Sequence, residues 1–340
     1  MKVIDLHCDS VFSLIEGKDL RHAVDRVHVD IPRLQKGEVG LQVFAAYVPP
    51  DLVAGMSPFA YIVERLNTID AFSRSDPRLA PVETLAEARA VMANGITGIM
   101  AAVENGFAIE SSLKNLEALR RLKVRIMTLV HSQHMDWIAS CTGTVPGGGD
   151  FSPSGNGRGL SSFGEQVVDA MNDLGIIPDV SHSAPSAFWD VIRRSKKPIV
   201  ASHSCAYSIC AAARNLCDDQ LMALGESGGL VGVNFFSGFL SEEFRRLSMQ
   251  SKLEDATNIS VHVPMSIIAD HIVYMVDIAG EDCVALGSDF DGIPATPEGV
   301  TGSDFYPVLE SELKSRGFSE QRIEKIFSGN FLRLLEVWSR

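Results

Sequence analysis

The stretch IIPDVSHSAPSAFWDVIRRSKKPIVASHS, residues 176–204, contains the pattern that decides the fold. It begins and ends with short apolar segments that we interpret as β-strands, since continuous apolar runs are typical of strands buried on both faces. Between them, residues 185–195 have the spacing of a helix. Strand, helix and strand together predict a parallel β–α–β unit whose two strands end at histidines, His182 and His203.

The same alternation of strand and helix continues along the chain. The predicted strands are 2–9, 39–48, 97–105, 124–131, 176–183, 198–204, 229–236 and 283–291. The predicted helices are 58–72, 83–93, 111–122, 163–174, 185–195, 218–227, 264–279 and 319–336. About eight repeats predict an α/β fold, a (β/α)8 TIM barrel. A doubly wound open sheet competes with it, but that fold usually carries a glycine-rich phosphate loop, and the sequence contains no GxGxxG or P-loop motif.

Composition restricts the partners. The chain has 340 residues, 46% of them apolar and 21% charged, and 30 Lys and Arg against 43 Asp and Glu give a formal charge of −13. Because no basic surplus is available to neutralise phosphates, we expect neither nucleic acid nor an anionic membrane as a partner. Length alone, at about 150 residues per domain, favours two domains.

No segment predicts export or membrane insertion. The N-terminus, MKVIDLHCDS, has no apolar signal-peptide core, and no run approaches the roughly 20 apolar residues of a membrane helix. The six cysteines form no CxxC pair and are interpreted as buried thiols. We therefore expect a soluble, cytoplasmic protein.

Polar side chains stand at the ends of six of the eight predicted strands. They are His7 with Asp9, Glu104, His131, His182, His203, and Asp289 with Asp291. The C-terminal ends of barrel strands lie on one face, where barrel enzymes carry their active sites. Site residues that span positions 7 to 289 and meet at one face favour a single domain, residues 1–340, over two.

The chemistry of these residues predicts a metal site. His7 and Asp9, two residues apart on a strand, are expected to point the same way, with Cys8 pointing away. Imidazole and carboxylate groups suit a borderline cation such as Zn²⁺. Glu104 lies in the apolar run MAAVEN, where burial without a cation would be costly. Three histidines and two acids suit two metal ions about 3.5–4 Å apart that share a carboxylate.

Other polar residues are interpreted as structural. Surface positions are expected for His22, His28, His134 and His262. His271 lies on the apolar face of the predicted helix 264–279, which indicates a hydrogen-bonded core histidine. Asp291 either orients Asp289 or caps the next helix. The Gly- and Ser-rich segment 141–162 is interpreted as a loop or flap over the active-site mouth.

A family resemblance is carried by five segments. They are DLHCD (5–9), LVHSQHMDW (129–137), LSSFGEQVVDAMNDLGIIPDVSHS (160–183), PIVASHSCAYSICAAARNLCDD (198–219) and VALGSDFDG (284–292). The chain resembles the membrane (renal) dipeptidase family, binuclear zinc peptidases of the amidohydrolase superfamily. The resemblance implies an amidohydrolase-like barrel, hydrolysis of dipeptide substrates and tolerance of a D-residue at the C-terminal position. It also favours a homodimer.

The resemblance implies a role for each matching position. One zinc ion is bound by His7 and Asp9, the other by His182 and His203, and Glu104 bridges them. His131 holds the oxygen of the scissile carbonyl or of the tetrahedral intermediate. Arg214 grips the C-terminal carboxylate of the substrate, a task that suits its planar guanidinium. Asp289 carries the proton from the attacking water to the leaving amine.

The sequence departs from the family pattern at two positions and leaves two alternatives open. Leu6 and Asn105 stand where the family usually has glycines, before the first histidine and after the bridging glutamate. One alternative is another binuclear amidohydrolase that acts on a lactone, cyclic amide or phosphoester, and Arg214 together with His131 argues against it. The other is an inactive metal-binding scaffold, which retention of the five implied ligands and Asp289 disfavours.

Overall fold

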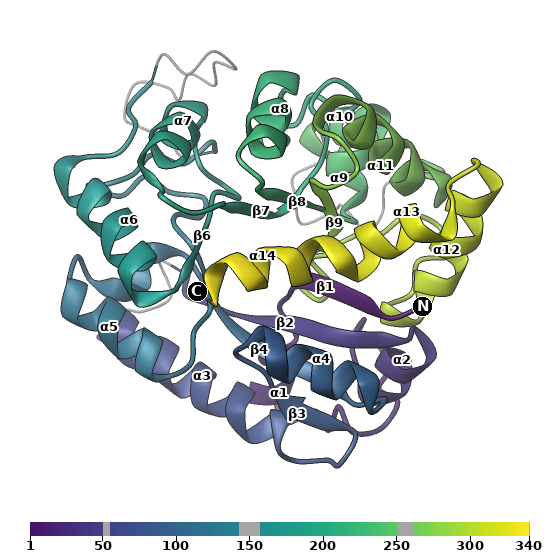
Figure 1. Ribbon diagram of the computed structural model, residues 1–340, viewed down its shortest axis with the longest axis horizontal. Helices are drawn as coiled ribbons and strands as arrows, with labels where there is room; N and C mark the ends of the chain where they lie inside the picture. The colour runs from purple at the N-terminus through teal and green to yellow at the C-terminus, as the bar shows by residue number, and fades with distance from the viewer. Residues whose placement is uncertain (50–54, 143–156, 251–260, 340) are drawn as a thin grey trace.

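The computed structural model of the chain describes residues 1–49, 55–142, 157–250 and 261–339. Its strands are β1 (Val3–Cys8), β2 (Val39–Tyr47), β3 (Leu79–Pro81), β4 (Thr97–Glu104), β5 (Ile126–Thr128), β6 (Ile177–Asp179), β7 (Val200–Ser204), β8 (Leu230–Val233) and β9 (Val284–Leu286). Its α-helices are α1 (Val11–Ile15), α2 (Ile31–Lys36), α3 (Pro58–Ser73), α4 (Leu85–Ala93), α5 (Leu113–Arg121), α6 (Ser162–Leu174), α7 (Pro185–Arg194), α8 (Asp218–Glu226), α9 (Ser237–Leu240), α10 (Glu242–Gln250), α11 (Ser266–Ala279), α12 (Tyr306–Ser315), α13 (Glu320–Glu324) and α14 (Asn330–Trp338). The helices surround the strands (Figure 1).

The strands form a closed parallel barrel. Within the described residues the strand order is β2-β1-β9-β8-β7-β6-β5-β4-β3, and a further pairing of β2 with β4 closes a ring of eight. Each of the eight predicted segments contains one strand of this ring, which confirms the (β/α)8 TIM barrel.

The additional strand, β3, lies outside the ring. It pairs with Thr97–Ile99 at the beginning of β4, while β5 pairs with the end of the same strand. The sequence did not predict β3, because three residues that end in a proline show no measurable strand periodicity.

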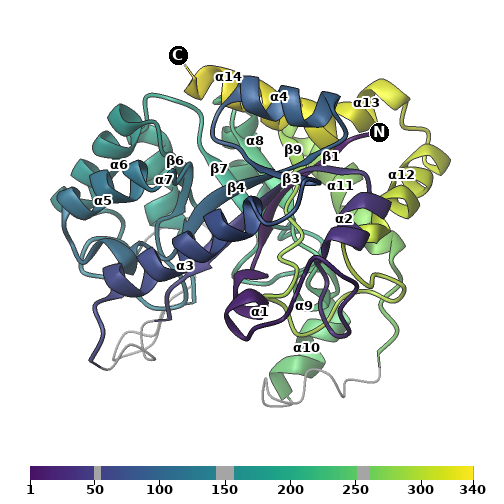
Figure 2. The same cartoon turned by 90° about the horizontal axis from the view of Figure 1, so that it is seen from below.

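Helix α14 covers the N-terminal end of the barrel. Apolar side chains from all eight barrel strands, such as Ile126 and Val200 at the first positions of β5 and β7, form one buried cluster with Phe331 and Trp338 of α14. Figure 2 shows α14 at one end of the molecule and α1, α9 and α10 at the other. A larger cluster packs the outer faces of the strands against the surrounding helices. The C-terminal ends of the strands are therefore the end available for a site.

The predicted helices are present, with shifted ends. The expected capping box between Thr84 and Glu87 begins α4. The predicted helix 264–279 begins at Ser266. The predicted helix 319–336 is interrupted by a π-helical turn, Lys325–Gly329, between α13 and α14. Most of the predicted flap, residues 143–156 of 141–162, lies outside the described residues.

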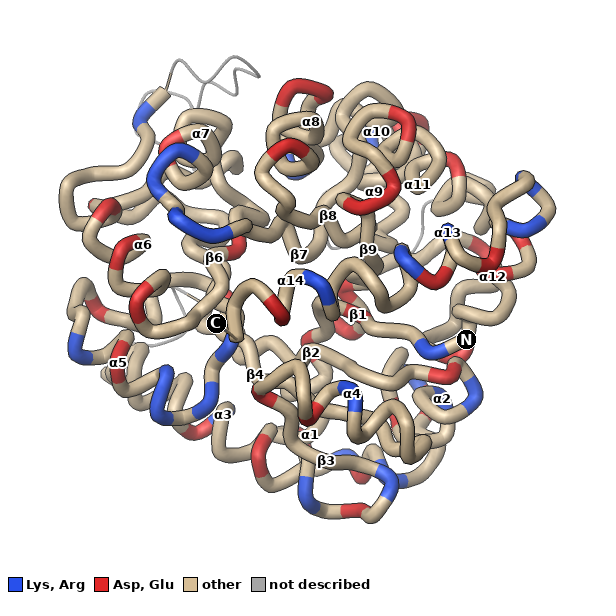
Figure 3. Tube along the Cα trace, in the orientation of Figure 1, with Lys and Arg blue, Asp and Glu red and all other residues tan. Residues whose placement is uncertain are grey.

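Three further observations bear on the composition. The six cysteines are free thiols; four of them are buried, as expected, whereas Cys141 and Cys217 are partly exposed. Charged positions of both signs are interspersed along the outer helices (Figure 3). Among the described residues, no helix has the length and apolar character needed to cross a membrane.

Candidate functional site

All eight strands of the barrel place a polar side chain at one rim. In strand order these are His7, Tyr47, Glu104, His131, His182, His203, Asn234 and Asp289. The sequence predicted six of these positions, and the structure brings all six together. Tyr47 and Asn234, at the ends of β2 and β8, were not predicted.

Glu104 lies at the centre of the group. Its Oε1 atom is 3.1 Å from Nε2 of His182, 3.5 Å from Nε2 of His203 and 3.8 Å from Nε2 of His131. Its Oε2 atom is 3.7 Å from Nε2 of His7. A carboxylate with imidazole nitrogens around both oxygens has the position of a bridging ligand.

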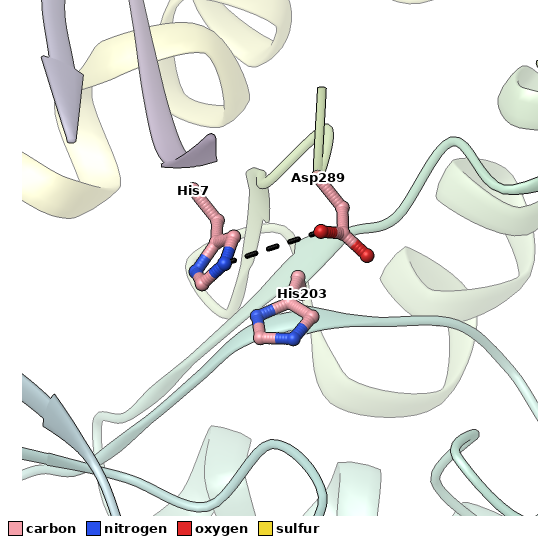
Figure 4. Close-up of side chains that lie close together, drawn as sticks. All are labelled: His7, His203 and Asp289. Carbon is pink, nitrogen blue, oxygen red and sulfur yellow. Dashed lines mark ion pairs between the residues drawn. The ribbon is translucent and has the colours of Figure 1, made fainter. Parts of the chain in front are cut away.

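His7 joins this group to two further carboxylates. Its Nε2 atom is 3.6 Å from Oδ2 of Asp9 and 4.0 Å from Oδ1 of Asp289. Figure 4 shows the ring of His7 facing Asp289, with the ring of His203 beside them. The rings of His7 and His203 have centroids 3.9 Å apart. The site is therefore continuous from β1 to β7 and β9.

The buried polar atoms of the site fit a metal. Nε2 of His7 and Oδ1 of Asp9 have no hydrogen-bond partner among the described residues. Such atoms are costly to bury, and a cation satisfies them. Three overlapping trios of residues each bring ligand atoms within 4.8 Å of one another: His7, His203 and Asp289; Glu104, His131 and His182; and His7, Asp9 and Glu104. Nitrogen and carboxylate donors in these numbers suit zinc and similar ions.

Local irregularities in the strand pairing orient the side chains of His7 and His203 toward the site. The pairing of β1 with β2 shifts register between Asp5 and Cys8, so His7 reaches the interior directly after Leu6, which packs inside the barrel. The pairing of β7 with β8 shifts in the same way next to His203. Bulges of this kind redirect side chains beside active sites. Cys8 packs in the outer core, as expected.

Left-handed backbone conformations mark the same rim. The φ angles are +82° at Asn105, +67° at His182 and +63° at Asp289. Residues other than glycine rarely adopt positive φ, and such strain concentrates at functional sites. Asn105 stabilises its conformation by donating to the carbonyl of Val48 and accepting from the N–H of Phe107. A residue other than the family's usual glycine is therefore accommodated here.

Burial and neighbouring charges set the protonation of the site. Burial, together with the charge of Arg214, lowers the pKa of His182 and His203 well below the usual value, so both rings are neutral, the form that binds metal. Burial raises the pKa of Glu104, but His7 and His131 outweigh it and hold that pKa well below its usual value. Burial raises the pKa of Asp289 to about 8.

A cavity of about 740 Å³ lies above the site. Its lining includes Glu104, His131, His182 and Asp289, the aromatic residues Phe12, Tyr47, Phe236 and Phe239, and Arg214. Arg214 is buried, and its guanidinium lies 5.4 Å from the centroid of the Phe239 ring. Its Nη2 donates to the carbonyl of His203 at 3.0 Å, while Nε has no partner among the described residues. A fixed cation at a cavity wall is suited to an anionic group.

Comparison with known proteins agrees with this arrangement. The family model of membrane dipeptidase, peptidase family M19, matches residues 1–339. This chain belongs to the membrane dipeptidase family. An uncharacterized dipeptidase of Schizosaccharomyces pombe is 31% identical over the whole chain and 80% of its own length. Dipeptidase 3 of Rattus norvegicus is 29% identical over 92% of this chain, which spans 59% of the rat protein's length.

A solved structure extends the comparison to the fold. The metallopeptidase of Rhodobacter sphaeroides, crystallised with a phosphinate mimic of the dipeptide L-Ala-D-Ala, matches with a TM-score of 0.86. It is 28% identical, and the match covers 99% of each chain. The barrel and its family are thus established independently of the site geometry.

Two residues of this chain, Tyr47 and Asn234, were not predicted from the sequence. Each contacts a predicted site residue. The hydroxyl of Tyr47 lies 3.3 Å from Nδ1 of His131, and their rings are 4.5 Å apart. Asn234 donates to Oδ2 of Asp289 at 2.8 Å. The signal available in the sequence was positional, since both residues lie near the ends of predicted strands, 39–48 and 229–236, that had been left without a site residue.

Two of the four histidines expected at the surface are only partly exposed. His28 is only partly exposed, and its Nδ1 accepts from the N–H of Asp291 at 3.0 Å. His134 is likewise partly buried and accepts from the N–H of Ser140. His22 and His262 are exposed, and His271 is a hydrogen-bonded core residue.

Asp291 has neither of the expected roles. Its carboxylate accepts from the hydroxyl of Ser10 at 2.5 Å and from the N–H of His28 at 2.6 Å. It therefore ties the segments after β1 to the loop after β9. Sequence reasoning missed this link because the partners lie 281 and 263 positions away.

Proposed function

We propose that this protein is a dipeptidase that uses two Zn²⁺ ions, one held by His7 and Asp9, the other by His182 and His203, with Glu104 as the bridge. One observation carries the proposal. Five side chains from four strands bring buried nitrogen and oxygen atoms together, and two of these atoms, on His7 and Asp9, have no partner among the described residues. Zinc supplies a Lewis acid that polarises a carbonyl group and acidifies water.

Arg214 selects the substrate. Its planar guanidinium and fixed charge, at the wall of the cavity, bind the free carboxylate at the C-terminus of a peptide. With the carboxylate held at the wall of a cavity of about 740 Å³, the amide beside Glu104 is the last one in the chain. Short peptides cleaved one residue from the C-terminus are thereby favoured, which supports dipeptidase over endopeptidase action.

His131 and Asp289 act on the reacting atoms. His131 donates a hydrogen bond to the oxygen of the scissile carbonyl as negative charge develops there, an effect typically worth about 2.7–4 kcal/mol. Asp289 accepts the proton of the attacking water and returns it to the leaving amine as the C–N bond breaks. The hydrogen bond from Asn234 holds one oxygen of Asp289 in place while the other faces His7.

We further propose that a D-residue is tolerated at the C-terminal position. The family resemblance supports this, as does the related Rhodobacter sphaeroides metallopeptidase, whose ligand mimics L-Ala-D-Ala. The ring of Phe239 lies 5.4 Å from the Arg214 guanidinium, and Phe236 packs against Phe239, so apolar surface adjoins the place where the C-terminal residue lies in this proposal.

A screen of L,L- and L,D-dipeptides with zinc-loaded protein tests these proposals. We expect hydrolysis of free dipeptides, little hydrolysis of their C-terminal amides, and about two zinc ions per chain by elemental analysis. Loss of activity on chelation and its return with zinc are also expected, and the matched variant Asp289→Asn should bind zinc but hydrolyse poorly. Metal-free protein that hydrolyses dipeptides equally well contradicts the mechanism. Hydrolysis of lactones or phosphoesters alone, or of nothing, favours one of the two alternatives.

A further inference from the structure

Below His203, a second carboxylate is completely enclosed by hydrogen-bond donors. Asp179, the last residue of β6, has no exposed surface. Its Oδ2 accepts from the hydroxyls of Thr128 at 2.5 Å and Ser202 at 2.6 Å. Its Oδ1 accepts from the backbone N–H groups of Ser181 and Ser202, both at 2.9 Å. The carboxylate thus joins β5, β6 and β7 directly beneath the proposed metal site.

The hydroxyl of Ser202 also contacts the ring of His203. Its Oγ lies 2.7 Å from Nδ1 of His203. A serine hydroxyl has one proton, and the Ser202 hydroxyl donates it to Oδ2 of Asp179. The Ser202 proton is therefore committed to Asp179, so Oγ can only accept from the ring. It follows that Nδ1 of His203 carries a proton and that Nε2 carries the lone pair.

The free nitrogen points to the proposed metal site. Nε2 of His203 lies 3.5 Å from Oε1 of Glu104 and 3.0 Å from Nε2 of His182. Metal-binding histidines generally donate their second N–H to a carboxylate, carbonyl or water, which fixes the tautomer and ring orientation. Here a serine stands between the imidazole and the carboxylate.

We propose that Asp179 is a positioning residue that acts through Ser202 to hold His203 as the Nδ1–H tautomer, with Nε2 aimed at the metal. This inference rests on the proposed function, because it needs His203 to be a ligand. Asp179 itself touches neither metal nor substrate.

A similar pair elsewhere in the barrel joins strands without reaching a ring. Asp5 of β1 accepts from the N–H of Ser288 at 2.9 Å and from its hydroxyl at 2.6 Å, and also from the hydroxyl of Tyr306. The Ser288 hydroxyl also contacts the backbone carbonyl of His7 at 3.3 Å and accepts from the N–H of Phe290 at 3.2 Å. An Asp–Ser pair between strands therefore has a structural use by itself. The test must separate that use from the effect on His203.

The experiment compares Ser202→Ala with Thr128→Val in the full-length protein. Both substitutions delete one hydroxyl that donates to Asp179, but only Ser202 contacts the ring of His203. Zinc affinity is measured by competition with a chromophoric chelator, and ligand geometry by the visible absorption of the Co²⁺-loaded protein. We expect Ser202→Ala to weaken one of two zinc sites about 10- to 100-fold and to change the Co²⁺ spectrum. Thr128→Val should lower stability but keep both properties, and Ser202→Thr should restore them.

Two results separate failure of this inference from failure of the proposed function. If the wild type binds about two zinc ions and Ser202→Ala binds them equally well with an unchanged Co²⁺ spectrum, the positioning role is overturned while the proposed function stands. The positioning role is overturned in the same way if Thr128→Val weakens zinc binding as much as Ser202→Ala. If the wild type binds no zinc, the proposed function fails, and this inference fails with it.

Discussion

Acid should destabilise this protein through His271, a residue remote from the proposed chemistry. The ring is fully buried on α11. Its Nδ1 accepts from the N–H of Ala206 at 3.1 Å, and its Nε2 donates to the carbonyl of Leu240 at 3.0 Å. A protonated ring has no acceptor for Ala206, so the fold requires the neutral form. Burial accordingly lowers the pKa of His271 to about 4.

The magnitude follows from the difference between the folded and unfolded pKa values. Above about pH 6.5, the pKa of an unperturbed histidine, the ring is neutral in both states and adds no pH dependence. Below about pH 6.5 the unfolded chain binds a proton at His271 that the folded protein excludes. Each further drop of one pH unit therefore lowers the free energy of unfolding by about 1.4 kcal/mol. The loss from His271 is about 2 kcal/mol at pH 5 and about 3 kcal/mol at pH 4, where the folded protein begins to bind the proton.

Urea denaturation of metal-free protein between pH 8 and pH 4.5 measures this effect. His271→Gln should be less stable than the wild type at pH 8, because glutamine cannot reproduce both hydrogen bonds. The gap should then shrink by about 2 kcal/mol between pH 6.5 and pH 5, because only the wild type loses stability through this group. The control is His22→Gln, whose parent side chain is 78% exposed, and it should keep the wild-type pH dependence. A gap between His271→Gln and wild type that stays constant over this range refutes the reasoning.

Other predictions concern the site. Arg214→Lys keeps the charge but loses the planar guanidinium, so kcat/KM for dipeptides should fall about 10- to 100-fold. For dipeptides with a C-terminal amide, kcat/KM of the variant should equal that of the wild type. Equal losses for both kinds of substrate speak against carboxylate binding. Asp289→Asn should keep about two zinc ions in elemental analysis and lower kcat about 10²- to 10⁴-fold in steady-state assays; a variant with unchanged kcat removes Asp289 from the reaction. A Cβ atom on Gly292 would lie 2.1 Å from Oδ2 of Asp9 and 2.7 Å from Oδ1 of Asp289. Gly292→Ala should therefore lose zinc as well as activity. Full zinc content in this variant would be inconsistent with Asp9 as a ligand. Zinc at 100 times its Kd should raise the free energy of unfolding in urea by about 2.7 kcal/mol, and no change would indicate that the folded protein does not bind it.

The barrel and the grouping of six site positions were predictable because they depend only on the order of elements. Parallel strands place their C-terminal ends on one face whatever the loops do. His182 and His203 could therefore be brought together from the sequence without any knowledge of distances. The same rule, applied to the remaining two strands, points to Tyr47 and Asn234, whose contacts with His131 and Asp289 needed the structure.

Features that depend on pairs of residues far apart in the chain were not predictable in this way. The link between His28 and Asp291 joins two loops, and no periodicity reports it. Asp5 and Asp179 did leave a signal, since each is an acid inside an apolar strand, but the serines that bind them lie on neighbouring strands. The homodimer, the single domain and the cytoplasmic location stay predictions.

In chain order, the last pairing that completes the barrel joins its first strand, β1, to its last strand, β9. β1 pairs with β9 at Asp5 and Leu286, and a second bridge joins Cys8 to Phe290, residues 281 and 282 positions apart. During synthesis, His7 thus leaves the ribosome long before the strand that places Asp289 beside it. Contacts of such long range form slowly, and until they form the strand edges on both sides of the gap stay open to other chains. We therefore expect the interval before ring closure to be when a nascent chain of this protein is most open to wrong strand pairing.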